Sequence, residues 1–319
     1  MPSAKSSRSK TSVKTGPPRP SSAFEKAMHE LKHQPPAAFP NVSLGWLLKA
    51  AVAVLLAAVA FGWLALCLLY WQGSWQLLYH PTTAINRTPA SVGLAYEPVH
   101  FAATETGVTQ LTGWWLPNSN AARTVLYLHG ADGNLGDTVD NLAALHSAGL
   151  AVFAVDYRGY GQSIPARPTE KQLRQDAEWA LTWLTLTRSI PAKSIVIYGS
   201  NLGANVAAEL ASDHNELAGV ILDQPQQNAM APVFNDSRSH LVPAHWLVKD
   251  RYDLTAAARS LKIPSLWLLD ANRPDASLPG AKPSAYAQAP EQKAEVWLKA
   301  PISADPHYSQ AIQRWLDDL

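Results

Sequence analysis

The sequence has only one cysteine, Cys67, and few charged residues, and both shortages exclude classes of protein. A single cysteine can form neither an intrachain disulfide nor a multi-cysteine zinc site. Charged residues make up 16% of the 319 residues and hydrophobic residues 47%, which is ample material for a core. After residue 49 there remain 18 basic and 23 acidic residues, without the basic stripe that nucleic-acid binding requires. We therefore expect no nucleic-acid partner.

The basic residues are concentrated at the start of the chain. Residues 1–49 hold eight Lys/Arg and two Glu, and residues 1–43 are rich in Ser, Pro, Lys and Ala. A segment with so little apolar material cannot offset its ordering entropy, so we predict that residues 1–43 are disordered. The pattern allows a short helix around Ser22–His33, although such a helix is not stable alone.

One long uncharged run follows this tail. Ala50 to Trp71 is 22 residues without a charge, which spans roughly 33 Å as a helix and is enough for a bilayer core. A cleaved signal peptide would have a shorter apolar run and small residues near its end, whereas this run ends Leu-Tyr-Trp. We therefore predict a single transmembrane helix within residues 44–72, with Cys67 as a small membrane hydrophobe. Seven Lys/Arg lie in the tail 1–43, which predicts that the tail is cytoplasmic and that the domain over 73–319 is extracytoplasmic.

The remainder alternates between strand and helix signals. Its later strand-like runs are short and continuously apolar, as expected for strands buried on both faces. Two early strands without a helix between them predict an antiparallel start to the sheet. The expected strands are His100–Ala103, Gln110–Leu116, Thr124–His129, Leu150–Asp156, Ser194–Tyr198, Gly219–Asp223, Ser265–Asp270 and Ala294–Leu298.

Helical stretches separate most of these strands, which predicts a mostly parallel, doubly wound α/β sheet. The segment of about residues 225–262 is the longest one without a strand, and it is the natural place for a small lid. The expected helices are Leu135–Ala148, Glu170–Thr187, Leu202–Ser212, Ser284–Ala289 and Tyr308–Leu319.

The most informative motif joins the run Ile195–Tyr198 to the helix that starts at Leu202. An apolar strand meets Gly199, turns within three residues and continues past Gly203 as a helix. This is the pattern of a nucleophile elbow, in which the residues two before and two after a strained apex must be small. The middle residue of the three between the two glycines is Asn201. This is the apex position, where such an elbow carries its nucleophile.

Several motifs in the same order give the chain its family resemblance. The stretch from about Trp75 to Leu319 resembles the membrane-anchored α/β-hydrolase-domain proteins, related to prolyl-aminopeptidase-like, lysophospholipase-like and acyl-thioesterase serine hydrolases. The motifs are specific for the α/β-hydrolase fold, which they imply together with a small lid. They are Leu78-Tyr79-His80-Pro81, Gly113-Trp114-Trp115-Leu116-Pro117, Tyr127-Leu128-His129-Gly130-Ala131-Asp132-Gly133-Asn134, Asp156-Tyr157-Arg158-Gly159-Tyr160-Gly161-Gln162-Ser163 and Lys262-Ile263-Pro264.

The resemblance also implies the remaining members of a catalytic triad. Matching the family's Asp-x-x-Ile-Pro pattern to this chain selects Asp275 as the acid, with Asp270 as the alternative. The base is implied at His307, which follows the last strand in the order serine–acid–histidine. The backbone N–H groups of Leu202 and Ala131 are the expected oxyanion hole.

No cofactor or metal is expected. The run from Asp132 to Asp137 has some calcium-type ligands but lacks the full spacing and the distal glutamate. We instead predict that Asp132 caps the helix that starts nearby.

Asparagine at the apex changes what the site can do. An amide nitrogen is a poor nucleophile, and His307 could not activate it by removing a proton. Loss of the serine in comparable triads costs on the order of 10⁶ in turnover, while asparagine tolerates the strained backbone. The neighbouring Ser200 is the alternative nucleophile, although adjacent residues at a strand end point to opposite sides.

Three interpretations therefore stay open. The first is a pseudo-hydrolase whose pocket binds an acyl or ester ligand or a protein partner, and it is the one the intact glycines around Asn201 favour. The second is an active serine hydrolase (esterase, thioesterase or peptidase-like) that works through Ser200. The third is a structural partner in a membrane complex. Aromatic residues in the lid segment, Phe234, Trp246 and Tyr252, suggest an apolar ligand.

Overall fold

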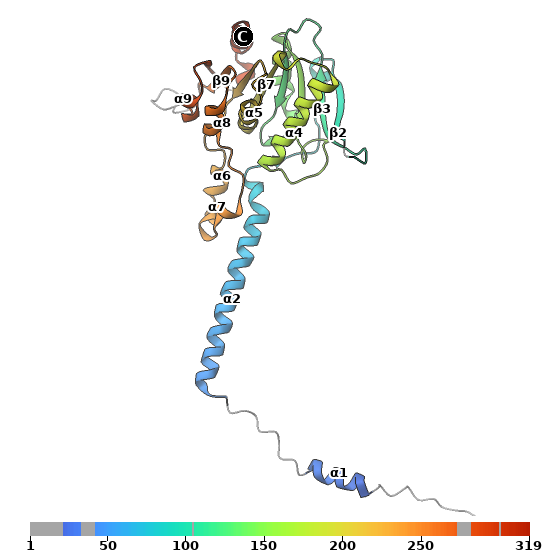
Figure 1. The fold of residues 1–319 in the computed structure, drawn as a ribbon, viewed down its shortest axis with the longest axis vertical. Helices are drawn as coiled ribbons and strands as arrows, with labels where there is room; N and C mark the ends of the chain where they lie inside the picture. Colours follow the sequence, from blue (N-terminus) through green and yellow to red (C-terminus); the bar gives the residue numbers. More distant parts are fainter. Residues whose placement is uncertain (1–21, 33–41, 104, 273–281, 300) are drawn as a thin grey trace, which may run out of the picture. The chain divides into compact units, whose positions relative to one another are not determined.

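A computed structural model describes residues 22–32, 42–103, 105–272, 282–299 and 301–319 (Figure 1). Its centre is an eight-stranded sheet in the order β10-β9-β8-β7-β4-β6-β3-β2. The strands are β2 (Glu97–Ala103), β3 (Thr109–Leu116), β4 (Thr124–Leu128), β6 (Ala151–Asp156), β7 (Ile195–Ser200), β8 (Gly219–Asp223), β9 (Ser265–Asp270) and β10 (Lys293–Leu298).

Strand direction in this sheet follows the prediction. β2 and β3 are antiparallel, β3 is antiparallel to β6, and every later pairing is parallel. Each predicted strand overlaps a strand of the sheet. The central strands are fully buried along their length, which explains why their sequences are continuous apolar runs.

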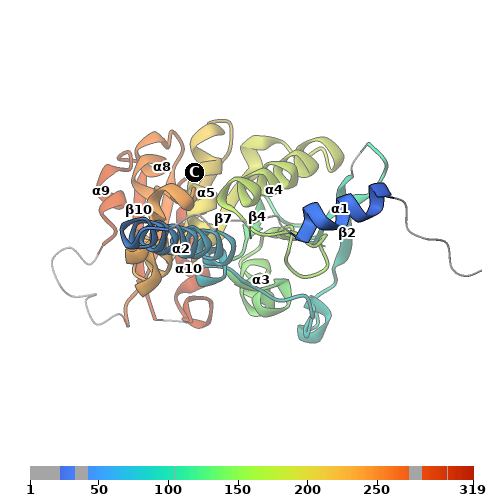
Figure 2. The same cartoon turned by 90° about the horizontal axis from the view of Figure 1, so that it is seen from below.

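Helices cover both faces of the sheet (Figure 2). Side chains of α3 and α10 pack into the core on one face, and those of α4, α5, α8 and α9 pack into the core on the other. This arrangement is the predicted doubly wound α/β architecture. The helices are α3 (Val139–Ser147), α4 (Glu170–Thr182), α5 (Leu202–Asp213), α8 (Leu254–Ser260), α9 (Ser284–Gln288) and α10 (Tyr308–Asp317).

Two helices precede the sheet. α1 (Ser22–Lys32) lies in the tail at the place where the sequence allowed a helix, and it has no buried residue. α2 (Leu44–Gly73) is long and apolar enough to cross a membrane. The compact unit that carries the sheet begins at Phe61 and includes the last turns of α2. These turns bond to residues far along the chain, as in the 2.8 Å bond from the Tyr70 hydroxyl to the Val233 carbonyl.

The predicted lid segment forms several short elements. They are α6 (Ala231–Phe234), the 3₁₀ turn Ser237–Leu241, α7 (Ala244–Leu247) and α8. α8 packs into the core beside α5, whereas α6 and α7 lie beside the last turns of α2 (Figure 1). Only the first residues of the segment, up to Asn228, are among the described residues that line the hollow beside Asn201.

Candidate active site

The turn between β7 and α5 has the geometry of a nucleophile elbow. Asn201 stands at its apex with φ 53° and ψ −118°, and its side chain is exposed. Both neighbouring glycines are sterically required. A Cβ at Gly199 would lie 2.2 Å from the carbonyl oxygen of Gly203, and one at Gly203 would lie 2.2 Å from that of Leu128. The strained apex is therefore enforced by close backbone packing on both sides.

Ser200 points away from the surface that Asn201 faces. Its side chain is buried, and its hydroxyl donates to an Asp223 carboxylate oxygen at 3.1 Å. The Asn201 amide donates to the same hydroxyl at 3.3 Å. The alternative nucleophile thus lies beneath the apex, in contact with a carboxylate at the end of β8.

Asp223 is the centre of a buried polar network under the elbow. The hydroxyl of Tyr198 donates to it at 2.9 Å, and the hydroxyl of Tyr308 donates to that of Tyr198 at 3.1 Å. Burial raises the pKa of the Asp223 carboxyl to about 6, against the hydrogen bonds that favour its charged form. The sequence marked Asp223 as a strand end but gave it no role. The sequence pattern that could have drawn attention to Asp223 is an apolar strand that ends in aspartate. The strands that end at Asp156 and Asp270 have the same pattern.

The loop after β4 packs directly on the elbow. A Cβ at Gly130 would lie 3.3 Å from the Asn201 Cβ, so this loop and the apex are in contact. The carbonyl of Ala131 accepts hydrogen bonds from the His80 N–H at 3.0 Å and the Tyr160 hydroxyl at 2.9 Å. These bonds fix the segment that carries the Ala131 N–H, one of the two predicted oxyanion donors. The other, Leu202, is the first residue of α5 and is buried.

A buried histidine–aspartate pair supports this loop from below. His129 Nε2 lies 3.5 Å from a carboxyl oxygen of Asp156, and both side chains are buried. Burial lowers the pKa of His129 to about 4 and raises the pKa of Asp156 to about 7. Both side chains are consequently neutral between about pH 4 and pH 7. The separation of 3.5 Å, with no hydrogen bond at His129 Nε2, fits a contact between neutral groups better than an ion pair.

The hydrogen bonds that position the His307 side chain come from Asp305. His307 precedes α10, its side chain is 76% exposed, and its ring bonds Asp305 at 3.1 Å. The Asp305 carboxylate also accepts the backbone N–H of His307 and of Lys299, which fixes this turn. Within the described part of the chain, no hydrogen bond joins His307 to Asn201 or Ser200.

Of the two candidate acids, Asp275 lies outside the described residues. Asp270 ends β9 and lines, with Asn201, a hollow of about 550 Å³. Five of the eleven described lining residues carry a side-chain amide, and two are charged, Asp270 and Lys282. The amide residues are Asn201, Gln224, Gln226, Gln227 and Asn228. This composition suits a ligand that forms hydrogen bonds.

The aromatic residues expected over the site lie elsewhere. Tyr252 is buried, and its hydroxyl bonds that of Tyr79 at 2.8 Å. Phe234 stacks on His245, and Trp246 is 86% exposed. None of the three is among the described residues of the hollow, so their apolar character says nothing about a ligand bound there.

The predicted capping role of Asp132 is wrong. Its carboxylate bonds the His80 ring at 2.6 Å, beside the short parallel pairing of β1 (His80–Pro81) with β5 (Asp132–Gly133). The cap is made by Asn134, whose side chain accepts from Gly136, while Asp137 accepts from the Asn134 N–H. Among the described residues, no group of three or more His, Cys, Asp or Glu could hold a metal ion.

Comparison with known proteins identifies curated relatives over part of the chain. An uncharacterised protein of Mycobacterium tuberculosis is 33% identical over 162 residues, which are 50% of this chain and 56% of the relative. An uncharacterised membrane protein of Saccharomyces cerevisiae is 34% identical, over 43% of this chain and 48% of its own length. Human alpha/beta hydrolase domain-containing protein 17B is 35% identical, over 37% of this chain and 41% of its own length. The chain thus spans about half the length of the curated relatives it matches.

Solved structures share the fold at lower identity. An esterase of Pyrococcus furiosus has a TM-score of 0.59 and 20% identity, over 76% of this chain and 98% of its own. An alpha-beta hydrolase of Vibrio vulnificus has a TM-score of 0.53 and 21% identity, over 72% of this chain and 81% of its own. These likenesses confirm the α/β-hydrolase fold. The model of the serine aminopeptidase S33 family matches residues 119–289, which include the elbow. The chain therefore belongs to the serine aminopeptidase S33 family of α/β-hydrolase-fold proteins.

Proposed function

We propose that this chain is a membrane-anchored pseudo-hydrolase that binds the carbonyl group of an acyl or ester ligand without forming an acyl-enzyme. The observation that carries this proposal is the elbow, where Asn201 holds the apex with an exposed amide while Ser200 is buried against Asp223. An amide cannot attack a carbonyl, and loss of the nucleophile alone costs on the order of 10⁶ in turnover.

The proposed ligand site is the hollow beside Asn201. The Asn201 amide and the backbone N–H groups of Ala131 and Leu202 are donors of the kind that bind a carbonyl oxygen. The amide-rich lining offers further donors and acceptors for a polar ligand. Recognition of a protein partner through the same hollow would use these groups on a peptide carbonyl.

Membrane anchorage through residues 50–71 is part of the proposal. α2 supplies a helix of sufficient length and apolarity, and the relative from Saccharomyces cerevisiae is described as a membrane protein. The basic tail supports a cytoplasmic N-terminus and an extracytoplasmic domain. Protease protection in sealed membrane vesicles tests this orientation: the tail should be cleaved only from the cytoplasmic side.

One observation favours the alternative of an active hydrolase. Ser200 lies within hydrogen-bond distance of Asp223, whose pKa of about 6 would let its carboxylate accept a proton near neutral pH. This pair is buried beneath the apex. A substrate would have to displace Asn201 before its carbonyl carbon could reach the Ser200 oxygen.

Labelling with a fluorophosphonate probe distinguishes the two functions. We expect the full chain in detergent to show no covalent labelling above that of Ser200→Ala or Asn201→Ala. Labelling of the native chain that disappears in Ser200→Ala would overturn the pseudo-hydrolase proposal and establish the alternative.

Ligand binding is tested with a hydrolysis-resistant ketone analogue of a short acyl ester. Asn201→Asp keeps the shape of the side chain but replaces its donor with an anionic acceptor, which repels a carbonyl oxygen. We expect this variant to bind the ketone at least about tenfold more weakly than the native chain. Equal affinities in a calorimetric titration would exclude Asn201 from the site.

A further inference from the structure

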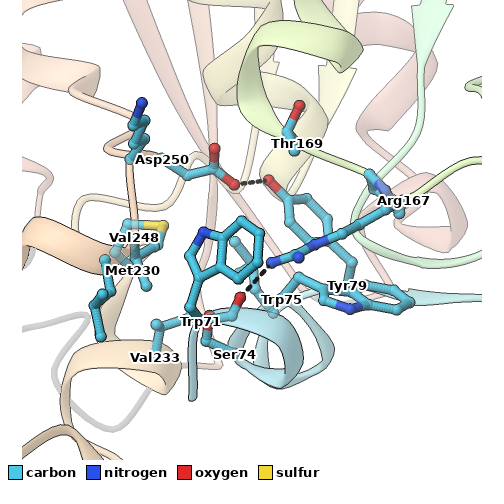
Figure 3. A pocket seen from close by; sticks show the side chains of 14 residues that line it. Trp71, Ser74, Trp75, Tyr79, Arg167, Thr169, Met230, Val233, Val248 and Asp250 are labelled. Carbon is cyan, nitrogen blue, oxygen red and sulfur yellow. Dashed lines mark hydrogen bonds between the residues drawn. The ribbon is translucent and has the colours of Figure 1, made fainter. Parts of the chain in front are cut away.

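A second pocket lies within the unit that begins at Phe61 and is lined by the last turn of α2 and by residues from 230 to 250 (Figure 3). It has a volume of about 230 Å³ and shares no residue, within the described chain, with the hollow beside Asn201. Many of its described lining residues are apolar: Trp71, Trp75, Leu78, Met230, Val233 and Leu247. Since complete small-molecule sites usually enclose about 300–1,000 Å³, this volume suits part of a ligand.

The segment that forms one wall runs back along the side of α2. The Tyr70 hydroxyl donates to the Val233 carbonyl at 2.8 Å, and the Trp63 indole donates to the Leu241 carbonyl at 3.0 Å. Trp63 is ten residues before Gly73, so Leu241 lies roughly 15 Å back along the helix from its end. α6 and α7 thus accompany the apolar helix rather than the sheet (Figure 1).

Two exposed side chains of this segment are large and apolar, and the same segment also exposes the charged residue Arg238, which pairs with Asp236. Leu241 is 60% exposed and Trp246 is 86% exposed. Large apolar groups beside an apolar helix are costly in water, whereas tryptophan is favoured where acyl chains meet headgroups. The pocket therefore lies at the level of the membrane interface if α2 crosses a bilayer.

The polar residues at the pocket favour an anionic headgroup. Arg167 and Lys249 supply two cations, and the Arg167 guanidinium lies over the Trp71 ring while donating to the Trp71 carbonyl at 2.8 Å (Figure 3). Asp250 is the acid among the described lining residues, and it accepts the Tyr79 hydroxyl at 2.7 Å. Burial raises the pKa of the Asp250 carboxyl. The remaining positive charge complements a phosphate, which arginine binds well.

We propose that this pocket binds an acyl chain of an anionic phospholipid from the surrounding membrane, with the lipid phosphate at Arg167 and Lys249. The site lies outside the elbow and rests on the proposed membrane anchorage. A bound lipid would join the end of α2 to residues 230–250.

Photo-crosslinking of the full chain in nanodiscs tests this site. The bilayer is phosphatidylcholine with a small fraction of a probe lipid that carries a diazirine on its acyl chain. The probe lipid is phosphatidylglycerol in one sample and phosphatidylcholine in the other. We expect mass spectrometry to map crosslinks to residues 71–78 and 230–233, with about fivefold higher yield for phosphatidylglycerol, since one basic residue contributes about that factor near anionic lipid. Lys249→Gln should lose this preference. The matched control Lys262→Gln, an exposed lysine before the start of β9, should keep it.

Other outcomes would overturn the site. Crosslinks confined to residues 44–60, or equal crosslinking yields for the two lipids, would mean that lipid surrounds α2 without occupying the pocket. Val233→Trp fills the pocket and should lower both yields, and a thermal melt establishes that this variant folds. If it does not fold, the comparison of lipids on the native chain still decides. A chain that fails to enter the nanodiscs would instead refute the membrane anchorage.

Discussion

Gly203→Ala is expected to lower the free energy of unfolding by more than about 4 kcal/mol, because its new Cβ would meet backbone that cannot move aside. That Cβ would lie 2.2 Å from the Leu128 carbonyl oxygen and 2.4 Å from that of His129. Both belong to the end of β4 and the loop that packs on Asn201, so relief of the clash would separate α5 from the centre of the sheet. Thermal unfolding in detergent should show a loss of about 10 °C.

Gly73→Ala is the matched control for this substitution. A Cβ at Gly73 meets nothing within 4 Å, and alanine is favoured over glycine in a helix by about 0.5–1 kcal/mol. Its melting temperature should therefore stay within a few degrees of the native chain. Equal shifts for the two variants would mean that the turn around Asn201 is not closely packed.

The elbow could be predicted from the sequence because everything that defines it is local. The strand, the two glycines and the start of α5 lie within about a dozen consecutive residues, and their spacing follows from the steric demands of one turn. The same holds for the central strands, whose continuous apolar runs follow from burial on both faces.

The surroundings of the elbow depend on contacts between distant segments. Tyr198, Asp223 and Tyr308 belong to different elements and are joined only by folding, so no local pattern marked Asp223 as the partner of Ser200. His307 was placed by its order in the chain, yet its side-chain direction is set by the turn around Asp305. The strand-free segment of about residues 225–262 could be located from the sequence, but its contacts with α2 could not.

Asp223→Asn is expected to make the protein more stable than the native chain above pH 7 and about equally stable near pH 4. The carboxyl titrates at about 6 in the fold and at about 3.9 in an unfolded chain. Because folding raises this pKa, the carboxyl contributes its full share to the stability of the fold below about pH 4. That contribution is lost as the pH rises through about 6. Asparagine keeps an acceptor for Tyr198 and Ser200 but carries no charge. The difference between the two proteins should therefore grow from pH 4 to pH 7, to about 1–3 kcal/mol, and then level off.

Asp223→Ala separates the hydrogen bonds from the charge. Alanine leaves the buried hydroxyls of Tyr198 and Ser200 without their acceptor, which should cost about 3 kcal/mol for the two groups together. Melting temperatures of the three proteins from pH 4 to pH 8 provide the measurement. If Asp223→Asn loses stability relative to the native chain as pH rises, the carboxylate is stabilised by its surroundings. Asp223 would then be a carboxylate of lowered pKa and a weaker base toward Ser200, and this result would count against the active-hydrolase alternative, which rests on a pKa near 6.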